Sequence, residues 1–244
     1  MKQLVIAASL ALLVGCAVQD GNKRIANSAD LRVVDAAMAN GMPQTALAVT
    51  REILQVDPRN VEALLRQGDT LVAIGQTDAA AECYLRVLEV DPQSVDGLRG
   101  LGRLRLAMGQ AHEAEAMFRK ALDHAPNDAA AFNNLGIALD LQDRHDEAQA
   151  AYQAALTQRP EMTAAKVNLG LSMALTGATD RALAILQPLA NDPAADGKVR
   201  QDLAVALALA GNAVQAGKVL SGELPQDKVA TALEGYLALK VSAK

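Results

Sequence analysis

The sequence predicts an all-α protein in which helix-turn-helix pairs repeat and stack into a solenoid. Three observations support this prediction: a 34-residue period, a glycine that recurs in one phase of that period, and a composition that favours helices. The period is marked by Pro58, Pro92, Pro126 and Pro160. Hydrophobic residues, rich in alanine and leucine, make up 51% of the 244 residues, and aromatic residues only 2%. A period of this length indicates a unit that buries its apolar face by stacking on its neighbours.

Residues 1–15 have the pattern of an export signal. Lys2 supplies a positive charge, and an uncharged apolar run extends from Leu4 to Val14. This run is too short to span a bilayer as a helix, which needs about 20 residues, but it suits the core of a signal peptide. The stretch from Leu13 to Cys16 resembles the bacterial lipobox, which implies that Cys16 is lipidated and begins the mature chain. An ordinary signal peptide cleaved elsewhere and a buried first helix are the alternatives.

Residues 16–26 are expected to form a flexible tether between Cys16 and the repeats. About ten residues of flexible chain have a root-mean-square reach of roughly 15 to 20 Å. The repeats would therefore lie just off a membrane.

Each repeat carries a glycine on its first helix and a large residue on its second helix. Because glycine inside a helix costs about 1 kcal/mol relative to alanine, its recurrence indicates close contact between helices. We expect the alanine twelve residues later to face the glycine, with the large residue one turn further filling the space beside it. The glycines are Gly68, Gly102, Gly136 and Gly170, the alanines Ala80, Ala114, Ala148 and Ala182, and the large residues Tyr84, Phe118, Tyr152 and Leu186.

The turns within and between the pairs also follow the period. Glycine can adopt the left-handed conformation that ends a helix, and Gly75, Gly109 and Gly177 occupy the turn between the two helices. Asp143 takes this place in the fourth repeat and is a weaker choice. Good N-cap residues for the next pair follow three of the prolines, namely Asn60, Ser94 and Asp128.

Residues 130–160, "AAFNNLGIALDLQDRHDEAQAAYQAALTQRP", combine these features and strongly resemble the tetratricopeptide repeat. The resemblance implies a right-handed superhelical solenoid over residues 27–240, with five to six repeats and a C-terminal capping helix. The repeats are expected at residues 27–60, 61–94, 95–128, 129–162, 163–195 and 197–230, and the capping helix at residues 226–240. The first and last repeats depart most from the pattern, as terminal units exposed to solvent on one face usually do.

The composition excludes several classes of function. A net charge of −5 without a run of basic residues argues against a nucleic-acid partner. His112 and His145, near inter-helix turns, and His124 are expected to be exposed, and nothing in their spacing demands a metal site. Cys83 is expected to be an inert thiol, with an intermolecular disulfide as the alternative. We therefore expect no enzymatic activity, no small-molecule substrate, and no cofactor other than the lipid on Cys16.

The first helices of successive repeats are expected to form a concave face that binds protein partners. The phase of the family's groove positions places a polar and basic half first and an apolar half after it. The predicted groove residues are Arg66, Arg99, Arg103, Asn133, Asn134, Asn168, Val167 and Leu171. The apolar half continues with Ile137, Leu141, Leu175, Val205 and Leu209. Packing against the capping helix is the alternative role of this half.

Arg99 and Arg103 are four residues apart on one helix face, so both could bind a carboxylate of a partner peptide. We expect both side chains to be exposed. The alternative is that they pair within the chain with Asp69 and Asp96. The Lys, Asn and Arg set with which some tetratricopeptide domains bind a C-terminal carboxylate is not reproduced in this sequence.

The whole mature chain resembles the TadD family of tight-adherence (Flp) pilus assembly lipoproteins, most clearly over residues 190–220, "ANDPAADGKVRQDLAVALALAGNAVQAGKVL". The resemblance implies a non-enzymatic scaffold, similar to a secretin pilotin, that assists assembly of the pilus secretion machine. Its partners would be the secretin or other pilus assembly components. It would lie at the outer membrane, lipid-anchored on the periplasmic face, and Ala17 after Cys16 fits that destination.

Three other functions stay open: a type IV pilus pilotin, a lipoprotein of the outer-membrane protein assembly machine, and, more remotely, an envelope enzyme that uses His112 or His145.

Overall fold

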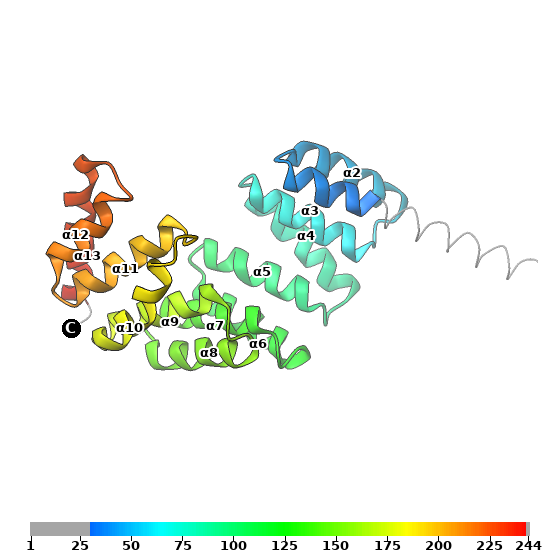
Figure 1. Ribbon diagram of the computed structural model, residues 1–244. Coiled ribbons are helices and arrows are strands. Elements are labelled where there is room, and N and C mark those ends of the chain that lie inside the picture. Colours follow the sequence, from blue (N-terminus) through cyan, green and yellow to red (C-terminus); the bar gives the residue numbers. More distant parts are fainter. Residues whose placement is uncertain (1–29, 243–244) are drawn as a thin grey trace, which may run out of the picture. The chain divides into compact units, whose positions relative to one another are not determined.

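The structure is a computed structural model that describes residues 30–242 (Figure 1). Every regular element in this part of the chain is a helix, which confirms the all-α prediction. The predicted signal at residues 1–15, the lipidation site Cys16 and the tether at residues 16–26 lie outside the described residues. Within residues 30–242, no helix is both long and apolar enough to cross a membrane.

The chain divides between Leu104 and Arg105 into two compact units, and the division falls within one helix. The first unit contains a helix over residues 30–39, α2 (Pro43–Val56), α3 (Val61–Ala73), α4 (Thr77–Val90) and most of α5 (Val95–Ala107). The second unit contains α6 (Ala111–His124), α7 (Ala129–Asp140), α8 (His145–Gln158), α9 (Thr163–Leu175), α10 (Thr179–Ala190), α11 (Gly197–Leu209), α12 (Ala213–Ser221) and α13 (Gln226–Ser242). The helices occur in pairs at the spacing that the 34-residue period predicts.

The residues predicted to begin the first helix of a pair do so by capping it. The Asn60 side chain accepts a hydrogen bond from the backbone N–H of Ala63, and the Ser94 hydroxyl accepts one from Gly97. Asp128 accepts from two backbone N–H groups of the first turn of α7. These bonds satisfy backbone donors that a helix leaves without an internal partner.

The turns inside the pairs have the predicted left-handed conformation. Gly75, Gly109 and Gly177 have φ of 75°, 73° and 83°. Asp143 adopts φ of 58° at the equivalent place, as its short polar side chain allows. The repeated turn therefore follows from one backbone position in each repeat.

The recurring glycines make room for the recurring large residues. A Cβ atom added at Gly68 would lie 2.8 Å from the Tyr84 ring, and one at Gly170 would lie 2.8 Å from Leu186. The prediction of close contact is confirmed. The atoms nearest to the added Cβ belong to the large residue of each repeat.

The core of each unit consists of these interhelix contacts. In the second unit Phe118, Tyr152, Leu186, Leu207 and Leu220 are all at most 1% exposed and belong to one hydrophobic cluster. In the first unit the largest fully buried side chains are Val34, Leu64, Tyr84 and Val87.

The last helix, α13, packs against α11 and α12. Val229 is buried in this contact, and Leu233 and Tyr236 pack against the same cluster. Gly217 of α12 again leaves space, because a Cβ there would lie 3.3 Å from Leu233. The apolar end of the repeat stack in the second unit is thereby covered by the chain itself.

Candidate functional site

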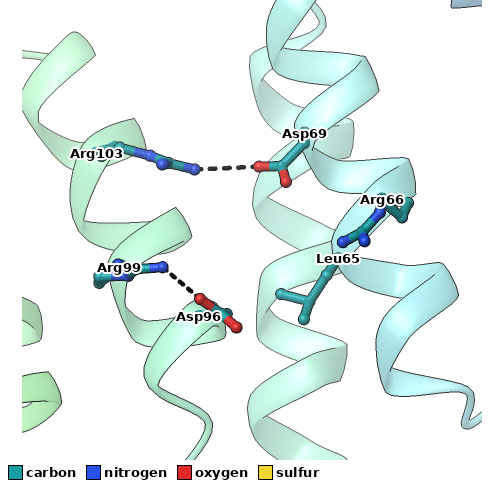
Figure 2. Close-up of a pocket in the computed structure, with 6 residues that line it drawn as sticks. All are labelled: Leu65, Arg66, Asp69, Asp96, Arg99 and Arg103. Atoms are coloured by element: carbon teal, nitrogen blue, oxygen red, sulfur yellow. Dashed lines mark hydrogen bonds and ion pairs between the residues drawn. The ribbon is translucent and has the colours of Figure 1, made fainter. Parts of the chain in front are cut away.

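A polar pocket of about 140 Å³ lies between α3 and α5 in the first unit. Figure 2 shows the residues that line it, which are three arginines, two aspartates and one leucine. Helix α3 contributes Leu65, Arg66 and Asp69, and α5 contributes Asp96, Arg99 and Arg103. Residues three or four apart lie on one face of a helix, so each helix presents its charged side chains together. The three arginines predicted from the sequence therefore line one pocket.

Arg103 and Asp69 join the two helices across the pocket. The Nη2 atom of Arg103 donates to Oδ1 of Asp69 at 3.1 Å, and the two side chains are 53% and 51% exposed. The same Asp69 oxygen accepts a hydrogen bond of 2.7 Å from the hydroxyl of Tyr84. Burial of the ring and the bond to Asp69 both raise the pKa of Tyr84, so the hydroxyl remains a donor. Asp69 is thus shared between a surface cation and a group anchored in the core.

Arg99 is less accessible than the sequence suggested. Its Nη2 atom pairs with the Asp96 carboxylate in the first turn of α5, and its side chain is only 25% exposed. The expectation that both Arg99 and Arg103 are exposed is therefore wrong for Arg99. The alternative of pairing within the chain, with Asp96 and Asp69, describes both arginines.

Arg66 also has a partner within the unit. Its Nε atom donates to Oδ1 of Asp35 at 2.7 Å, and Glu62 lies 3.7 Å from its Nη2 atom. The hydrogen bond with Asp35 outweighs burial and raises the pKa of Arg66. Sequence reasoning missed Asp35, although it lies 34 residues before Asp69 and so shares its phase.

The predicted asparagines and apolar residues belong to the second unit. The side chain of Asn168 donates to Oδ1 of Asn133 at 2.9 Å, so the two are brought together. Asn133 and Val167 are each 6% exposed and offer a partner little surface. Asn134, Asn168 and Leu171 are half-buried and more accessible. Binding of a partner by these residues stays a prediction.

The other apolar positions of the second unit differ in exposure. Leu141 is 59% exposed, Ile137, Leu175 and Val205 are half-buried, and Leu209 is buried.

His145 is half-buried, contrary to the expected exposed turn residue. Its Nδ1 atom lies 2.8 Å from Oδ1 of Asp140, which also accepts a 2.8 Å bond from the hydroxyl of Ser172. The second Asp140 oxygen accepts from the Tyr152 hydroxyl at 2.9 Å. Asp140 therefore ties α7, α8 and α9 together, and His145 is part of this structural network.

The remaining candidates for chemistry are dispersed. His112 and His124 are exposed, as expected. Within residues 30–242, no three His, Cys, Asp or Glu side chains form a group that could hold a metal ion.

Cys83 is buried beside Gln67, with its thiol 3.4 Å from the amide oxygen of that residue. Burial raises the pKa of the Cys83 thiol, which lowers its reactivity at neutral pH. The buried position supports the interpretation as an inert packing residue rather than a partner in an intermolecular disulfide.

Three family models, each described as a tetratricopeptide repeat, match residues 37–104, 94–161 and 142–196. Together they cover residues 37–196, more than half of the chain. The chain is a tetratricopeptide repeat protein. Its helix pairs, left-handed turns and glycine–aromatic contacts are the physical form of this repeat. None of the curated protein sequences compared with it matches significantly.

Solved structures of tetratricopeptide repeat architecture resemble this one. PilW, a type IV pilus biogenesis factor, superimposes with a TM-score of 0.76 at 21% identity, covering 84% of this chain and 97% of that one. Pseudomonas aeruginosa PilF gives 0.71 at 15% identity, covering 82% and 92%. MamA gives 0.55 at 26% identity, covering 63% and 90%. At these identities the likeness to PilW and PilF concerns the fold alone.

Proposed function

We propose that this tetratricopeptide repeat protein is a non-enzymatic outer-membrane lipoprotein that binds protein partners and assists assembly of a Flp (tight-adherence) pilus secretion machine. The observation that carries the binding function is the pocket between α3 and α5, where successive first helices place charged side chains around an accessible hollow. First helices of such repeats form the surface on which these proteins bind their partners. The pocket therefore belongs to the part of the repeat suited to recognition.

The assignment to the pilus machine rests on the sequence. Residues 190–220 resemble the TadD family, and in the structure this segment forms α11 and α12, with Leu203, Leu207 and Leu220 buried. The fold likeness to PilW, a type IV pilus biogenesis factor, is compatible with this role. Secretin and pilus assembly proteins are the proposed partners.

The location rests on the export signal and on Cys16. A single acyl chain binds a membrane only marginally, so stable anchoring needs more than one chain. We propose that a lipid with several acyl chains on Cys16 holds the protein at the periplasmic face of the outer membrane, with residues 16–26 as the tether.

A type IV pilus pilotin and a lipoprotein of the outer-membrane protein assembly machine are the alternatives among binding proteins. The envelope-enzyme alternative is weakened by the placement of the histidines. The Nδ1 atom of His145 lies 2.8 Å from Oδ1 of Asp140, and His112 is exposed in the first turn of α6. A general base must lie within hydrogen-bond reach of a reacting group in a site that can hold substrate.

The proposed function is tested by isolating the lipidated protein from detergent-solubilised envelopes and identifying its partners by mass spectrometry. We expect secretin or pilus-platform proteins to co-purify, and their amount to fall when Arg103 is replaced by Glu. Arg103 is a better site for this change than Arg99, which is three-quarters buried. Co-purification of barrel-assembly proteins or cell-wall enzymes instead would assign the protein to another pathway.

The anchor is tested separately with Cys16→Ala. This change lies outside the repeats, so the chain should fold normally but leave the outer-membrane fraction, and piliation should fall. Normal piliation supported by the unlipidated, soluble form would contradict the proposed anchoring role.

A further inference from the structure

The three arginines that line the pocket between α3 and α5 differ in how they are paired (Figure 2). Arg66 donates to Asp35, with Glu62 also 3.7 Å away, and Arg99 pairs with Asp96 and is only 25% exposed. Arg103 is the most exposed of the three arginines, at 53% of its side chain.

Arg103 has donors to spare. A guanidinium group carries five N–H donors, and in the described part of the chain Arg103 uses its Nη2 atom toward Asp69. The contact is a single one of 3.1 Å between two half-exposed side chains. Exposed pairs of this kind change an equilibrium by about fivefold at most, whereas a bidentate arginine–carboxylate contact is stronger. A carboxylate that offers both oxygens can therefore displace Asp69.

Asp69 does not need Arg103 to keep its position. The Tyr84 hydroxyl donates to Asp69 at 2.7 Å. The Tyr84 ring is 1% exposed and lies against bare backbone at Gly68 and Gly100, where an added Cβ would lie 2.8 and 2.5 Å from it. Because the core fixes the ring, the hydroxyl holds Asp69 on its own side of the pocket while Arg103 turns to a new partner.

We propose that the pocket binds a carboxylate of the protein partner by exchange: Arg103 leaves Asp69 for the partner's carboxylate, and the Tyr84 hydroxyl retains Asp69. Arg103 is the residue that contacts the ligand, and Asp69 and Tyr84 are positioning residues. The inference rests on the proposed function, since it names the chemical group that a partner presents to this pocket.

The exchange is tested by titrating the isotope-labelled full chain with acetyl-Ala-Glu-Ala-Glu-Ala-amide and with the same peptide carrying Gln in place of Glu. The Nε–H resonances of arginine report binding by NMR. We expect the Glu peptide to shift the Arg103 resonance and to bind at least about fivefold more tightly than the Gln peptide. Equal binding of both peptides, or no shift with either, would overturn the proposal.

Three variants separate ligand contact from positioning. Arg103→Gln should weaken binding of the Glu peptide at least about fivefold. Asp69→Asn should tighten it about threefold, because the competing charge is removed. Tyr84→Phe should weaken it about twofold, because Asp69 can then follow Arg103 into the pocket. A weaker complex with Asp69→Asn would show that Asp69 itself contacts the ligand, and would contradict the exchange.

Arg119→Gln is the matched control. Arg119 is 51% exposed and pairs with Glu115 at 2.8 Å, so it matches Arg103 in exposure and in having a carboxylate partner, but it lies in the second unit. Its replacement should leave binding of the Glu peptide unchanged, and a loss equal to that of Arg103→Gln would indicate general charge attraction.

The two proposals fail separately. If pilus proteins co-purify equally well with Arg103→Gln, the carboxylate exchange is wrong while the scaffold function stands. If the Glu peptide binds as expected but no pilus protein co-purifies, the pocket chemistry stands and the pathway is wrong.

Discussion

Tyr84 in the first unit and Tyr152 in the second unit occupy the same slot of the repeat, 68 residues apart. Both rings are 1% exposed and cover a glycine of the preceding helix. Their hydroxyls donate to aspartates that differ in exposure and in their other partners. Tyr84 donates to Asp69, which is 51% exposed and shared with Arg103, whereas Tyr152 donates to Asp140, which is 18% exposed and shared with His145 and Ser172.

The difference shows how one packing unit can serve two purposes. In the second unit the polar end of the ring is locked into a network among α7, α8 and α9, which favours stability. In the first unit the same end supports an aspartate at the edge of an open pocket, where its second partner can be exchanged. The two repeats therefore share the packing of the ring and differ in the exposure and the other partners of the aspartate that accepts the tyrosine hydroxyl.

Both tyrosine rings pack against a glycine, and replacing that glycine should have the largest effect on stability. Gly136→Ala should lower the free energy of unfolding by about 3 kcal/mol, because the added Cβ meets the Tyr152 ring within a packed core. Gly68→Ala should cost less, about 2 kcal/mol, because its Cβ lies slightly further from Tyr84. Denaturant unfolding measures both values.

Gly235→Ala in α13 is the control, since nothing lies within 4 Å of a Cβ at that position. It should stabilise the chain by up to about 1 kcal/mol through helix propensity. Equal losses at Gly235 and Gly136 would mean that glycine matters for the helix and not for the ring.

Replacing each tyrosine with phenylalanine removes the hydroxyl but keeps the ring, so it measures what each hydroxyl contributes to stability. Tyr152→Phe should cost about 1.5 to 2 kcal/mol, because it leaves the largely buried Asp140 short of a donor. Tyr84→Phe should cost less than about 1 kcal/mol, because water can replace the donor at the half-exposed Asp69. Chemical denaturation distinguishes them, and equal costs would remove the distinction between a locked and an open partner.

The last comparison concerns ion pairs, with expected costs of about 1 kcal/mol or less. In the second unit the Glu115 carboxylate, 12% exposed, accepts from Arg144 at 2.7 Å and from Gln142 at 3.0 Å. Burial alone would raise the pKa of Glu115, but hydrogen bonds from Gln142, Arg119 and Arg144 outweigh it and lower the pKa. A lowered pKa in the folded state means that the carboxylate stabilises the fold above the unfolded value of about 4.3. This contribution is lost as the pH falls through the lower folded value.

Glu115→Gln should therefore lower the free energy of unfolding by about 1 kcal/mol at pH 7, and the difference from the wild type should shrink below about pH 4. Asp35→Asn in the first unit removes a pair whose carboxylate is 54% exposed, and should cost less at pH 7. Unfolding curves between pH 3 and pH 7 measure both. A Glu115→Gln difference that persists at pH 3 would contradict the assignment to the charged carboxylate.

Much of the fold follows from local rules that act within one repeat. Gly75 and Asp143 mark turns, and Asn60 caps a helix, because each acts on backbone within a few residues of itself. The 34-residue spacing then repeats these local choices, so the helix pairs could be predicted from the sequence.

The site was predicted in part. Their positions within the 34-residue period place Arg66, Arg99 and Arg103 on the first helices of neighbouring repeats, and in the structure they line one pocket. Phase did not reveal that Arg99 is three-quarters buried or that Asn133 packs inside, because exposure depends on how closely adjacent helices approach. That approach is set by side chains from other repeats.

The helices, their turns, the repeat family and the set of polar groups could be predicted from the amino-acid sequence. The partner of each polar group became known only from the folded chain: Asp69 for Tyr84, Asp140 for Tyr152, and Asp35 for Arg66. Secondary structure depends on interactions a few residues apart, whereas the strength and accessibility of a charge depend on groups that folding brings within about 3 Å and on the water it removes.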